Sequence, residues 1–308
     1  MHHYHAFELN IESELYFPEL LGRSDLAPPP AAYDVRIQFG DVRASGLEHA
    51  LMMRPFCQAN AEALWLHVPG VAYFLITQGS QIIIQPYLGV DEDSIRVFLL
   101  GSCMGALLMQ RDLFLFHGNA VKVGHHCISF VGHSGAGKST LSGAFFKRGY
   151  SILADDVCAV SAAGDVLPSF PQIKLWCDAA RHLNIETQSL RNIRPGIEKF
   201  AVPLGRHFHP TALPLKVVYV LHSHNKDEFS FTPISGMHKL KPLQNNTYRA
   251  SYLKGLAKDK FHFGRCGRIA NQITLVSIMR PNDGFQLDTL VDLIEADLMA
   301  RGLSNAGE

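Results

Sequence analysis

Apolar and polar residues alternate in several short runs in the first third of the chain. These runs cover residues 4–15, 35–39, 62–67, 71–77 and 81–85. Alternation with a period of two is typical of half-buried strands. The pairs Pro69-Gly70 and Gly79-Ser80 lie between the last three runs and predict tight turns. Residues 1–95 are therefore predicted to form a β-rich N-terminal domain with no evident group of acids, bases or nucleophiles.

The spacing of the apolar residues becomes helical near residue 95. Residues 95–110 carry apolar side chains three and four positions apart. Strand-like runs follow at 113–123, 125–132, 215–221 and 273–278, and residues 286–299 have the pattern of an amphipathic helix ended by Gly302. Residues 96–308 are therefore predicted to form a second domain, of the α/β class.

Composition narrows the classes of function. The chain has 308 residues, 47% of them hydrophobic, with 28 Lys+Arg and 28 Asp+Glu. This balance predicts a folded protein and argues against nucleic acid as a partner, because nonspecific nucleic-acid binding needs a basic surface. The N-terminus lacks the pattern of a signal peptide, and no apolar run reaches the length of about 18 residues that spans a membrane. We predict a cytoplasmic protein with no membrane partner; association of copies of this chain stays open.

One glycine-rich segment carries the strongest chemical signal. Residues 132–139 (GHSGAGKS) fit the pattern G-x-x-x-x-G-K-[ST], with an apolar β-branched run before them and a helical pattern after them. Glycines let the backbone approach phosphate closely, and the N–H groups at the start of the helix then face the anion. The residues predicted to surround the phosphates of a nucleoside triphosphate are Gly132, His133, Ser134, Gly135, Ala136, Gly137, Lys138, Ser139 and Thr140.

Two residues of this segment have side-chain roles in the prediction. Lys138 supplies a positive charge to the β- and γ-phosphates, and Ser139 supplies a hydroxyl ligand for Mg²⁺. The sequence therefore predicts a site for ATP or a related triphosphate together with Mg²⁺.

A pair of carboxylates follows the next predicted strand. The segment RGYSILADD ends in Asp155 and Asp156. In a strand–helix–strand unit the two parallel strands end at the same edge of the sheet, so both carboxylates should lie beside the phosphate loop. One can hold Mg²⁺, and the other can accept the proton of an attacking hydroxyl. His117 lies before an expected Gly118-Asn119 turn and is a candidate supporting residue, although an isolated His is often structural.

Three of these segments resemble the HPr serine kinase/phosphorylase family. The matching segments are His117-Gly118, Gly132 to Ser139, and Arg148-Gly149 to Asp156, within residues 112–160. A looser likeness, including QIKLW and the MRP segment with the closing helix, reaches the C-terminus. The resemblance implies a P-loop kinase core of the HPr kinase/phosphoenolpyruvate carboxykinase type beside the smaller β-rich domain.

The whole chain is most similar to the HPr-kinase-related kinases encoded in lasso-peptide gene clusters. This similarity includes the Y-x-A-F-type start and the VRIQFG segment. It implies an enzyme that uses ATP to phosphorylate a Ser hydroxyl near the C-terminus of a precursor peptide. By resemblance, Asp155 is the base, Asp156 is the metal-side carboxylate, and His117 orients the base or neutralises charge; the reverse roles of the two Asp residues stay open.

The chain also departs from the HPr kinases. Thr140 replaces the acidic residue that is common after the loop serine in that family, and the longer signature segment of the bifunctional enzymes is absent. HPr itself and phosphorolysis are therefore not the predicted substrate and reaction. No distinct oxaloacetate site is evident, which argues against a carboxykinase.

A further cation is expected to cover the γ-phosphate, where charge develops during transfer. The candidates are Arg191, Arg194, Lys199, Arg265 and Arg268. Lys199 is preferred because it follows the Pro195-Gly196 turn, whereas Arg265 and Arg268 belong to a segment, FHFGRCGRI, that looks flexible. Two other functions remain open from sequence: a kinase for a small-molecule hydroxyl, and an NTPase or nucleotide switch without transfer.

Overall fold

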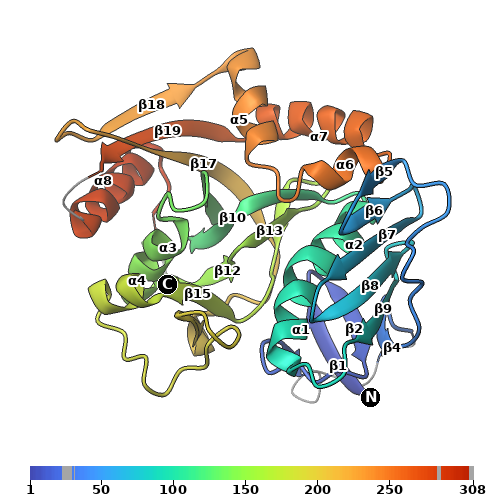
Figure 1. The fold of residues 1–308 in the computed structure, drawn as a ribbon. Helices are drawn as coiled ribbons and strands as arrows, with labels where there is room; N and C mark the ends of the chain where they lie inside the picture. Colours follow the sequence, from blue (N-terminus) through green and yellow to red (C-terminus); the bar gives the residue numbers. More distant parts are fainter. Residues whose placement is uncertain (23–29, 31, 283–285, 305–308) are drawn as a thin grey trace. The chain divides into compact units, whose positions relative to one another are not determined.

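The computed structural model describes residues 1–22, 30, 32–282 and 286–304. The chain forms two compact units. Unit 1 comprises Met1–Leu115, Ile193–Ile197 and Tyr248–Arg265, and unit 2 comprises Phe116–Asn192, Glu198–Thr247 and Cys266–Glu308. The protein is thus a mixed α/β chain with a large sheet in each unit (Figure 1).

Unit 1 contains a nine-stranded sheet in its described residues, with the order β3-β1-β2-β4-β9-β8-β7-β6-β5. The strands are β1 (His2–Ala6), β2 (Leu9–Ser13), β3 (Leu21–Gly22), β4 (Val35–Phe39), β5 (Met52–Arg54), β6 (Cys57–Ala59), β7 (Ala63–Val68), β8 (Ala72–Thr77) and β9 (Gln81–Pro86). The helices are α1 (Glu92–Phe98), the π-helical η2 (Leu99–Cys103), α2 (Met104–Gln110), α6 (Ser251–Gly255) and the first part of α7 (Asp259–Gln272).

Most of the predicted strands of unit 1 are confirmed. The strands β7, β8 and β9 form the expected antiparallel meander, and buried and half-buried residues alternate along β8 and β9. The single strand predicted for residues 4–15 is wrong, because β1 and β2 form a hairpin with Ala6 opposite Leu9. Phe7 and Glu8 make its two-residue turn, with φ values of 54° and 59°. Two positive φ angles match the right-handed twist of a hairpin, and no glycine marked this turn in the sequence.

The helical segment 92–110 clusters with unit 1, whereas the sequence-based division at residues 95/96 assigned most of it to the other domain. The Gln110 side-chain amide fixes this segment to the nine-stranded sheet of unit 1. Its oxygen accepts a hydrogen bond from Gly79 N (2.8 Å), and its nitrogen donates to Ile76 O (3.2 Å). These long-range contacts are not visible in the local hydrophobic pattern.

Unit 2 contains an eight-stranded sheet and a two-stranded sheet in its described residues. The strands are β10 (Phe114–Val123, from Phe116 in this unit), β11 (His126–Val131), β12 (Ile152–Ala154), β13 (Val157–Val160), β14 (Asp165–Leu167), β15 (Gln172–Trp176), β16 (Lys199–Pro203), β17 (Leu213–His224), β18 (Ser230–Ile234) and β19 (Thr274–Pro281). The helices are α3 (Lys138–Lys147), α4 (Cys177–His182), η3 (Gly205–His207), η4 (Gly236–Lys239), α5 (Leu240–Asn245), the last part of α7, and α8 (Leu287–Ala300).

The central strands of unit 2 bring the chemical segments together. β11 and β12 both pair antiparallel with β10, with Gly118 opposite Val131 and Ala120 opposite Ala154. β11 and β12 therefore run in the same direction and end at one edge, as predicted, but an antiparallel strand lies between them. On the other side, β11 pairs parallel with β17, and β17 pairs parallel with β19.

The expected turn at Gly118-Asn119 is wrong, because β10 continues through both residues. A Cβ atom at position 118 would lie 2.6 Å from Phe130 O, so the close approach of β11 requires glycine there. The chain turns instead at Gly124, whose φ is 55°. Glycine inside a strand can mark such a close approach rather than a turn.

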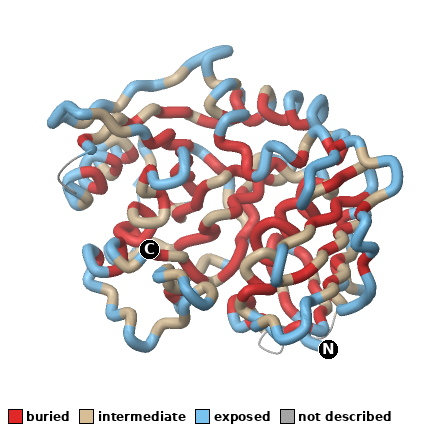
Figure 2. The backbone as a smooth tube through the Cα atoms, viewed as in Figure 1, coloured by how far each residue is buried: buried red, intermediate tan, exposed pale blue. Residues whose placement is uncertain are grey.

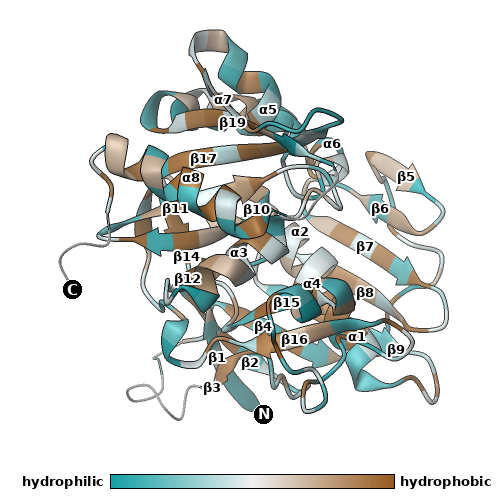
Figure 3. Ribbon diagram, turned by 90° about the vertical axis from the view of Figure 1, so that its left-hand side faces the viewer, coloured by the Kyte–Doolittle hydropathy of each residue, from teal (hydrophilic) through white to brown (hydrophobic). Residues whose placement is uncertain are grey.

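Large apolar side chains between the sheet and helices α3, α4 and α8 form the core of unit 2. Phe130, Phe145 and Tyr219 are fully buried within it. Figure 2 shows the buried positions gathered in the strands, and Figure 3 shows hydrophobic residues along strands such as β17 and β19. The predicted strand at 215–221 and the predicted helix at 286–299 are confirmed by β17 and α8.

The segment FHFGRCGRI is not a flexible loop but the middle of α7, in which Arg265 is buried. Among the described residues, no helix combines the length and the apolar character needed to cross a membrane.

Candidate functional site

The loop between β11 and α3 is the centre of the candidate site. It covers residues 132–137, and glycines give it its shape. Gly132 and Gly137 have φ values of 154° and 94°. A Cβ atom at position 132 would lie 2.8 Å from Leu221 O of β17. Both the backbone angles and the close packing therefore require glycine, and the loop leads directly into the N-terminus of α3.

Lys138 is the first residue of α3, and its side chain folds back over the loop. Its Nζ donates hydrogen bonds to Gly132 O (2.8 Å) and His133 O (3.0 Å). Burial lowers the pKa of Lys138, and the charge of Lys199 lowers it further, although Asp156 and Asp155 counteract part of this effect. The ammonium group thus lies at the mouth of a loop whose N–H groups precede a helix, an arrangement that suits an anion.

Asn119 fixes the start of α3 to the sheet. Its Nδ2 donates to Lys138 O (2.6 Å), and its Oδ1 accepts from Phe130 N (3.3 Å). The side chain is completely buried. Sequence reasoning assigned Asn119 to a turn and missed this role; a polar residue inside the otherwise apolar run of β10 was the signal available.

Asp155 directly follows β12 and is 5% exposed. Its Oδ1 accepts a hydrogen bond from Ser139 Oγ (3.1 Å), and its Oδ2 accepts one from Lys174 N (2.8 Å). Burial raises the pKa of Asp155, and the neighbouring charge of Asp156 raises it further, against the opposing effects of the Lys174 N–H, Lys199 and the Lys174 ammonium. The sequence-predicted hydroxyl ligand and one carboxylate are thus in direct contact.

Asp156 has a φ of 73°, in the left-handed region. Val157 N donates to Asp155 O (3.0 Å) across it, which makes a three-residue γ-turn between β12 and β13. γ-Turns with positive φ are rare and strained, and such strain is found mainly where the surrounding structure enforces it at a functional site. The turn directs the two consecutive carboxylates to different neighbours.

The neighbours of Asp156 are cationic or can become so. His117 Nδ1 lies 3.4 Å from Oδ1 of Asp156, and Lys174 Nζ lies 3.7 Å from Oδ2. Burial alone would raise the pKa of Asp156, but the charges of Lys174, His117, Lys199 and Lys138 outweigh it and lower the pKa. Asp156 is therefore held ionised, and 28% of its side chain remains exposed.

His117 lies in the middle of β10 rather than at its end. Burial and the charge of Lys138 lower the pKa of His117, and Asp156 opposes them. The imidazole is therefore mainly neutral at neutral pH while it touches the Asp156 carboxylate. This position is consistent with the supporting role expected from sequence.

Lys199, the preferred covering cation, is the first residue of β16. It pairs with Trp176 across the two-stranded sheet, and its Nζ lies 5.5 Å from the centre of the Trp176 ring. Its charge lowers the pKa values of both Asp155 and Asp156, so it lies within electrostatic reach of the pair.

The other candidate cations are distributed over both units. Arg194 and Arg265 belong to unit 1, where the Arg194 guanidinium lies 5.8 Å from the Phe98 ring centre. Arg191 and Arg268 belong to unit 2, in which Arg268 lies exposed on α7.

Sequence reasoning missed two further cations of unit 2. Lys174 lies in β15, where the run QIKLW shows a lone charged residue among apolar ones. Arg280 lies in β19, and its Nη2 approaches Ala136 O of the loop at 3.4 Å. Both segments belong to the looser family likeness in the sequence, which assigns no role to either side chain.

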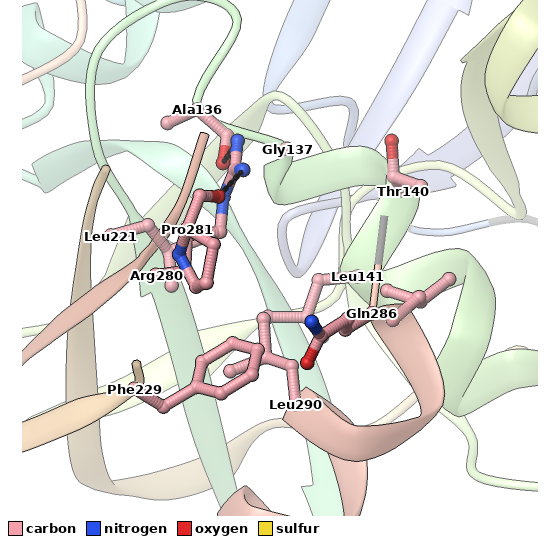
Figure 4. Close-up of a pocket in the computed structure, with 11 residues that line it drawn as sticks. Ala136, Gly137, Thr140, Leu141, Leu221, Phe229, Arg280, Pro281, Gln286 and Leu290 are labelled. Atoms are coloured by element: carbon pink, nitrogen blue, oxygen red, sulfur yellow. Dashed lines mark hydrogen bonds between the residues drawn. The ribbon is translucent and has the colours of Figure 1, made fainter. Parts of the chain in front are cut away.

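A pocket opens beside the loop, on the side of β19 and α8 (Figure 4). Ala136 and Gly137 line it together with Arg280, and Gln286 and Leu290 line the opposite side. It continues directly from the loop that would hold phosphate.

Comparison with solved structures gives a distant similarity. No family model matches the sequence, and no curated protein matches it. The structure of the Hpr(Ser) kinase/phosphatase from Coxiella burnetii is similar to this chain with a TM-score of 0.31 and 13% sequence identity, over 61% of this chain and 97% of that one.

Proposed function

We propose that this chain is a kinase that transfers the γ-phosphoryl group of Mg²⁺-bound ATP to a Ser hydroxyl of a peptide or protein. The observation that carries the proposal is the contact of Ser139, at the start of the loop helix, with the first of two adjacent carboxylates. Lys138 lies over the same loop. A phosphate cradle, a hydroxyl and a carboxylate pair are the parts that phosphoryl transfer requires.

Lys138 would exchange its two carbonyl acceptors for phosphate oxygens of the nucleotide. The hydrogen bonds to Gly132 O and His133 O occupy two of the three N–H groups of the ammonium. A buried ammonium with only neutral partners favours a nearby negative charge. The same hydrogen bonds hold the side chain within the loop, so little rearrangement is needed.

Asp155 suits the metal side of the site. Its Oδ1 touches the Ser139 hydroxyl, which is the group expected to ligate Mg²⁺, and its Oδ2 is occupied by Lys174 N. Hard oxygen donors of this kind fit Mg²⁺, which prefers one or two carboxylates together with phosphate oxygens and water. When bound, the ion would neutralise charge on the phosphates.

Asp156 suits the role of base, which reverses the order implied by the family resemblance. The raised pKa of Asp155 would favour that residue as the proton acceptor, whereas the contacts favour Asp156. A base must reach the acceptor hydroxyl, so the partial exposure of Asp156 outweighs the raised pKa of the enclosed Asp155. Asp156 is ionised and partly exposed, whereas both oxygens of Asp155 already accept hydrogen bonds.

The proposed step is an in-line displacement. The Ser oxygen forms a bond to the γ-phosphorus, the bond from this phosphorus to the bridging oxygen breaks, and ADP leaves. The Ser proton passes to the Asp156 carboxylate, and His117, whose Nδ1 lies 3.4 Å from Asp156 Oδ1, orients that carboxylate. Lys199 moves from the Trp176 ring to the transferring phosphoryl group, where its charge offsets the developing negative charge.

The acceptor part of the proposal rests on the sequence resemblance. We propose a precursor peptide of the lasso-peptide type, phosphorylated on a Ser near its C-terminus. A test uses labelled ATP with synthetic peptides that end in Ser, with matched peptides that end in Ala, and with a pool of small hydroxyl metabolites. Label on the Ser peptide alone supports the proposal; label only on metabolites, or release of phosphate without any labelled acceptor, contradicts the peptide assignment.

The phosphotransferase part is tested with Lys138→Ala. The expected result is loss of ATP binding and of phosphotransfer, with an unchanged circular dichroism spectrum. Lys147→Ala is the matched control, because Lys147 is an exposed lysine at the other end of the same helix. Full ATP affinity and turnover in Lys138→Ala would contradict the proposed role of the loop.

A further inference from the structure

We infer that the pocket between the 132–137 loop, β19 and α8 is a binding site for the adenine ring of the nucleotide. This inference rests on the proposed function, because it assumes that the loop holds the phosphates. It assigns the base to a defined set of side chains and predicts a preference for adenine.

The position of the pocket follows from the loop. Ala136 and Gly137 line it, and Thr140, one turn into α3, lines it as well. A nucleotide whose phosphates face the N-terminus of α3 therefore has this pocket beside its phosphate chain. It holds about 400 Å³ of space, part of which is open to solvent.

The walls of the pocket suit a flat aromatic ring. Phe229, Leu290 and Pro281 supply apolar surface, and Figure 4 shows the Phe229 ring beside Leu290 with Pro281 across the space. Phe229 is only partly buried, although it packs against the core. An aromatic ring that is left partly exposed at the edge of a pocket can stack on a base, whatever the base's identity.

Two polar side chains, at opposite sides of the pocket, would determine how a nucleotide is oriented in it. Arg280 lies on the loop side, where its guanidinium donates to Pro281 O (3.0 Å) and approaches Ala136 O (3.4 Å). It is thus available to the phosphate or ribose end of the ligand. Gln286 lies on the opposite side, where its Nε2 donates to Asp227 Oδ1 (3.5 Å) and its amide oxygen can accept a hydrogen bond from the edge of the base.

The chemistry of the lining favours adenine over guanine. Of the described side chains that line the pocket, none is a carboxylate. Guanine would bring an N1–H and an amino group as donors, and buried donors without acceptors are unfavourable. Adenine brings only its amino group as a donor, which the Gln286 amide oxygen can accept.

The test compares binding of ATP, GTP and inorganic tripolyphosphate to the full chain by calorimetry. The wild type is expected to bind ATP at least about tenfold more tightly than tripolyphosphate, since base stacking alone is typically worth that much. It should also bind ATP more tightly than GTP, whose N1–H and amino group would be buried without acceptors. Phe229→Ala should weaken ATP binding about tenfold and leave tripolyphosphate binding unchanged. Phe231→Ala is the matched control, because Phe231 is another partly buried Phe of the same segment that does not line the pocket.

The outcomes separate this inference from the proposed function. Unchanged ATP affinity in Phe229→Ala, equal losses for ATP and tripolyphosphate, or equal wild-type affinities for ATP and GTP would overturn the adenine site. Failure of the folded wild type to bind either ATP or tripolyphosphate would instead contradict the proposed function. If Phe229→Ala does not fold, Leu287→Arg blocks the same pocket, with Leu293→Arg on the exposed side of α8 as its control.

Discussion

Asp155 and Asp156 are adjacent in the chain, but the γ-turn between β12 and β13 gives them different neighbours. Asp155 is enclosed by Ser139 and Lys174 N, whereas Asp156 faces His117 and the Lys174 ammonium. Roles for the two carboxylates can therefore be separated by substitutions that keep the shape of each side chain.

Asp156→Asn is expected to lower turnover about 10²- to 10⁴-fold, the usual effect of losing a general base, with little change in ATP affinity. Asp155→Asn is expected to raise the Mg²⁺ concentration needed for half-maximal activity about ten- to hundredfold, because it removes the negative charge beside the Ser139 hydroxyl. Steady-state kinetics at varied Mg²⁺ measures both effects. The opposite pattern, with Asp155→Asn losing turnover at saturating Mg²⁺, would restore the order implied by the resemblance.

The buried His262 of α7 is expected to make the stability of the protein depend on pH. Burial lowers the pKa of His262 to about 4, and its ring stacks on Phe114 with centroids 4.9 Å apart. The unfolded chain takes up a proton on this residue below about pH 6.5. Between these two values the unfolded state binds more protons, so stability falls as the pH falls.

The expected loss from His262 between pH 7 and pH 5 is about 2 kcal/mol of the free energy of unfolding. Urea unfolding at both pH values gives the loss of unfolding free energy for the wild type and for His262→Gln. The difference between these two losses is the contribution of His262. His125→Gln is the control, since His125 is exposed. An equal loss in wild type and His262→Gln would contradict the assignment to His262.

At the scale of elements, the antiparallel strand β10 sets the geometry of the site. It holds β11 and β12 at a fixed register, and it carries His117 and Asn119 to the loop and the carboxylates. Gly118 lies between these two residues and allows the close contact with Phe130 O.

Gly118→Ala is therefore expected to destabilise the protein by about 1–3 kcal/mol, as overpacking typically does, and to lower turnover by shifting His117. Gly264→Ala is a matched control within α7, because an added Cβ atom there meets nothing within 4 Å. That variant should gain about 0.5–1 kcal/mol from helix propensity. Thermal unfolding and kinetics of both variants test the contrast; a neutral Gly118→Ala would show that β10 can move.

Strand β10 also shows which parts of the site could be predicted from the sequence and which could not. The loop glycines, Lys138 and the Asp pair could be proposed as site residues from the sequence, because each proposal depends on local spacing. The continuation of β10 through Gly118 was not, since a glycine in a strand and a glycine in a turn look alike without the partner strand. Lys174 was missed for a similar reason: its contact with Asp156 depends on how strand β15 lies beside the end of β12, which local spacing does not indicate.

At the scale of the whole molecule, unit 1 is completed by a segment from late in the chain. Tyr248 N donates to Leu115 O (2.8 Å), and the Tyr248 ring packs so closely on α2 that a Cβ atom at Gly105 would lie 2.8 Å from it. His262 covers Phe114 in the same way. Residues 248–265 therefore belong to the core of unit 1, and no local pattern in the sequence indicates this.

A fragment of residues 1–115 is consequently expected to lack cooperative thermal unfolding, because the apolar faces of α2 and β10 that Tyr248 and His262 cover would be exposed to water. Joining residues 248–265 to this fragment through a short Gly/Ser linker should restore a cooperative transition, since Leu115 and Tyr248 are already hydrogen-bonded neighbours. Circular dichroism melts of both fragments measure this. A cooperative transition in the 1–115 fragment alone would show that the late segment packs on a unit that folds without it.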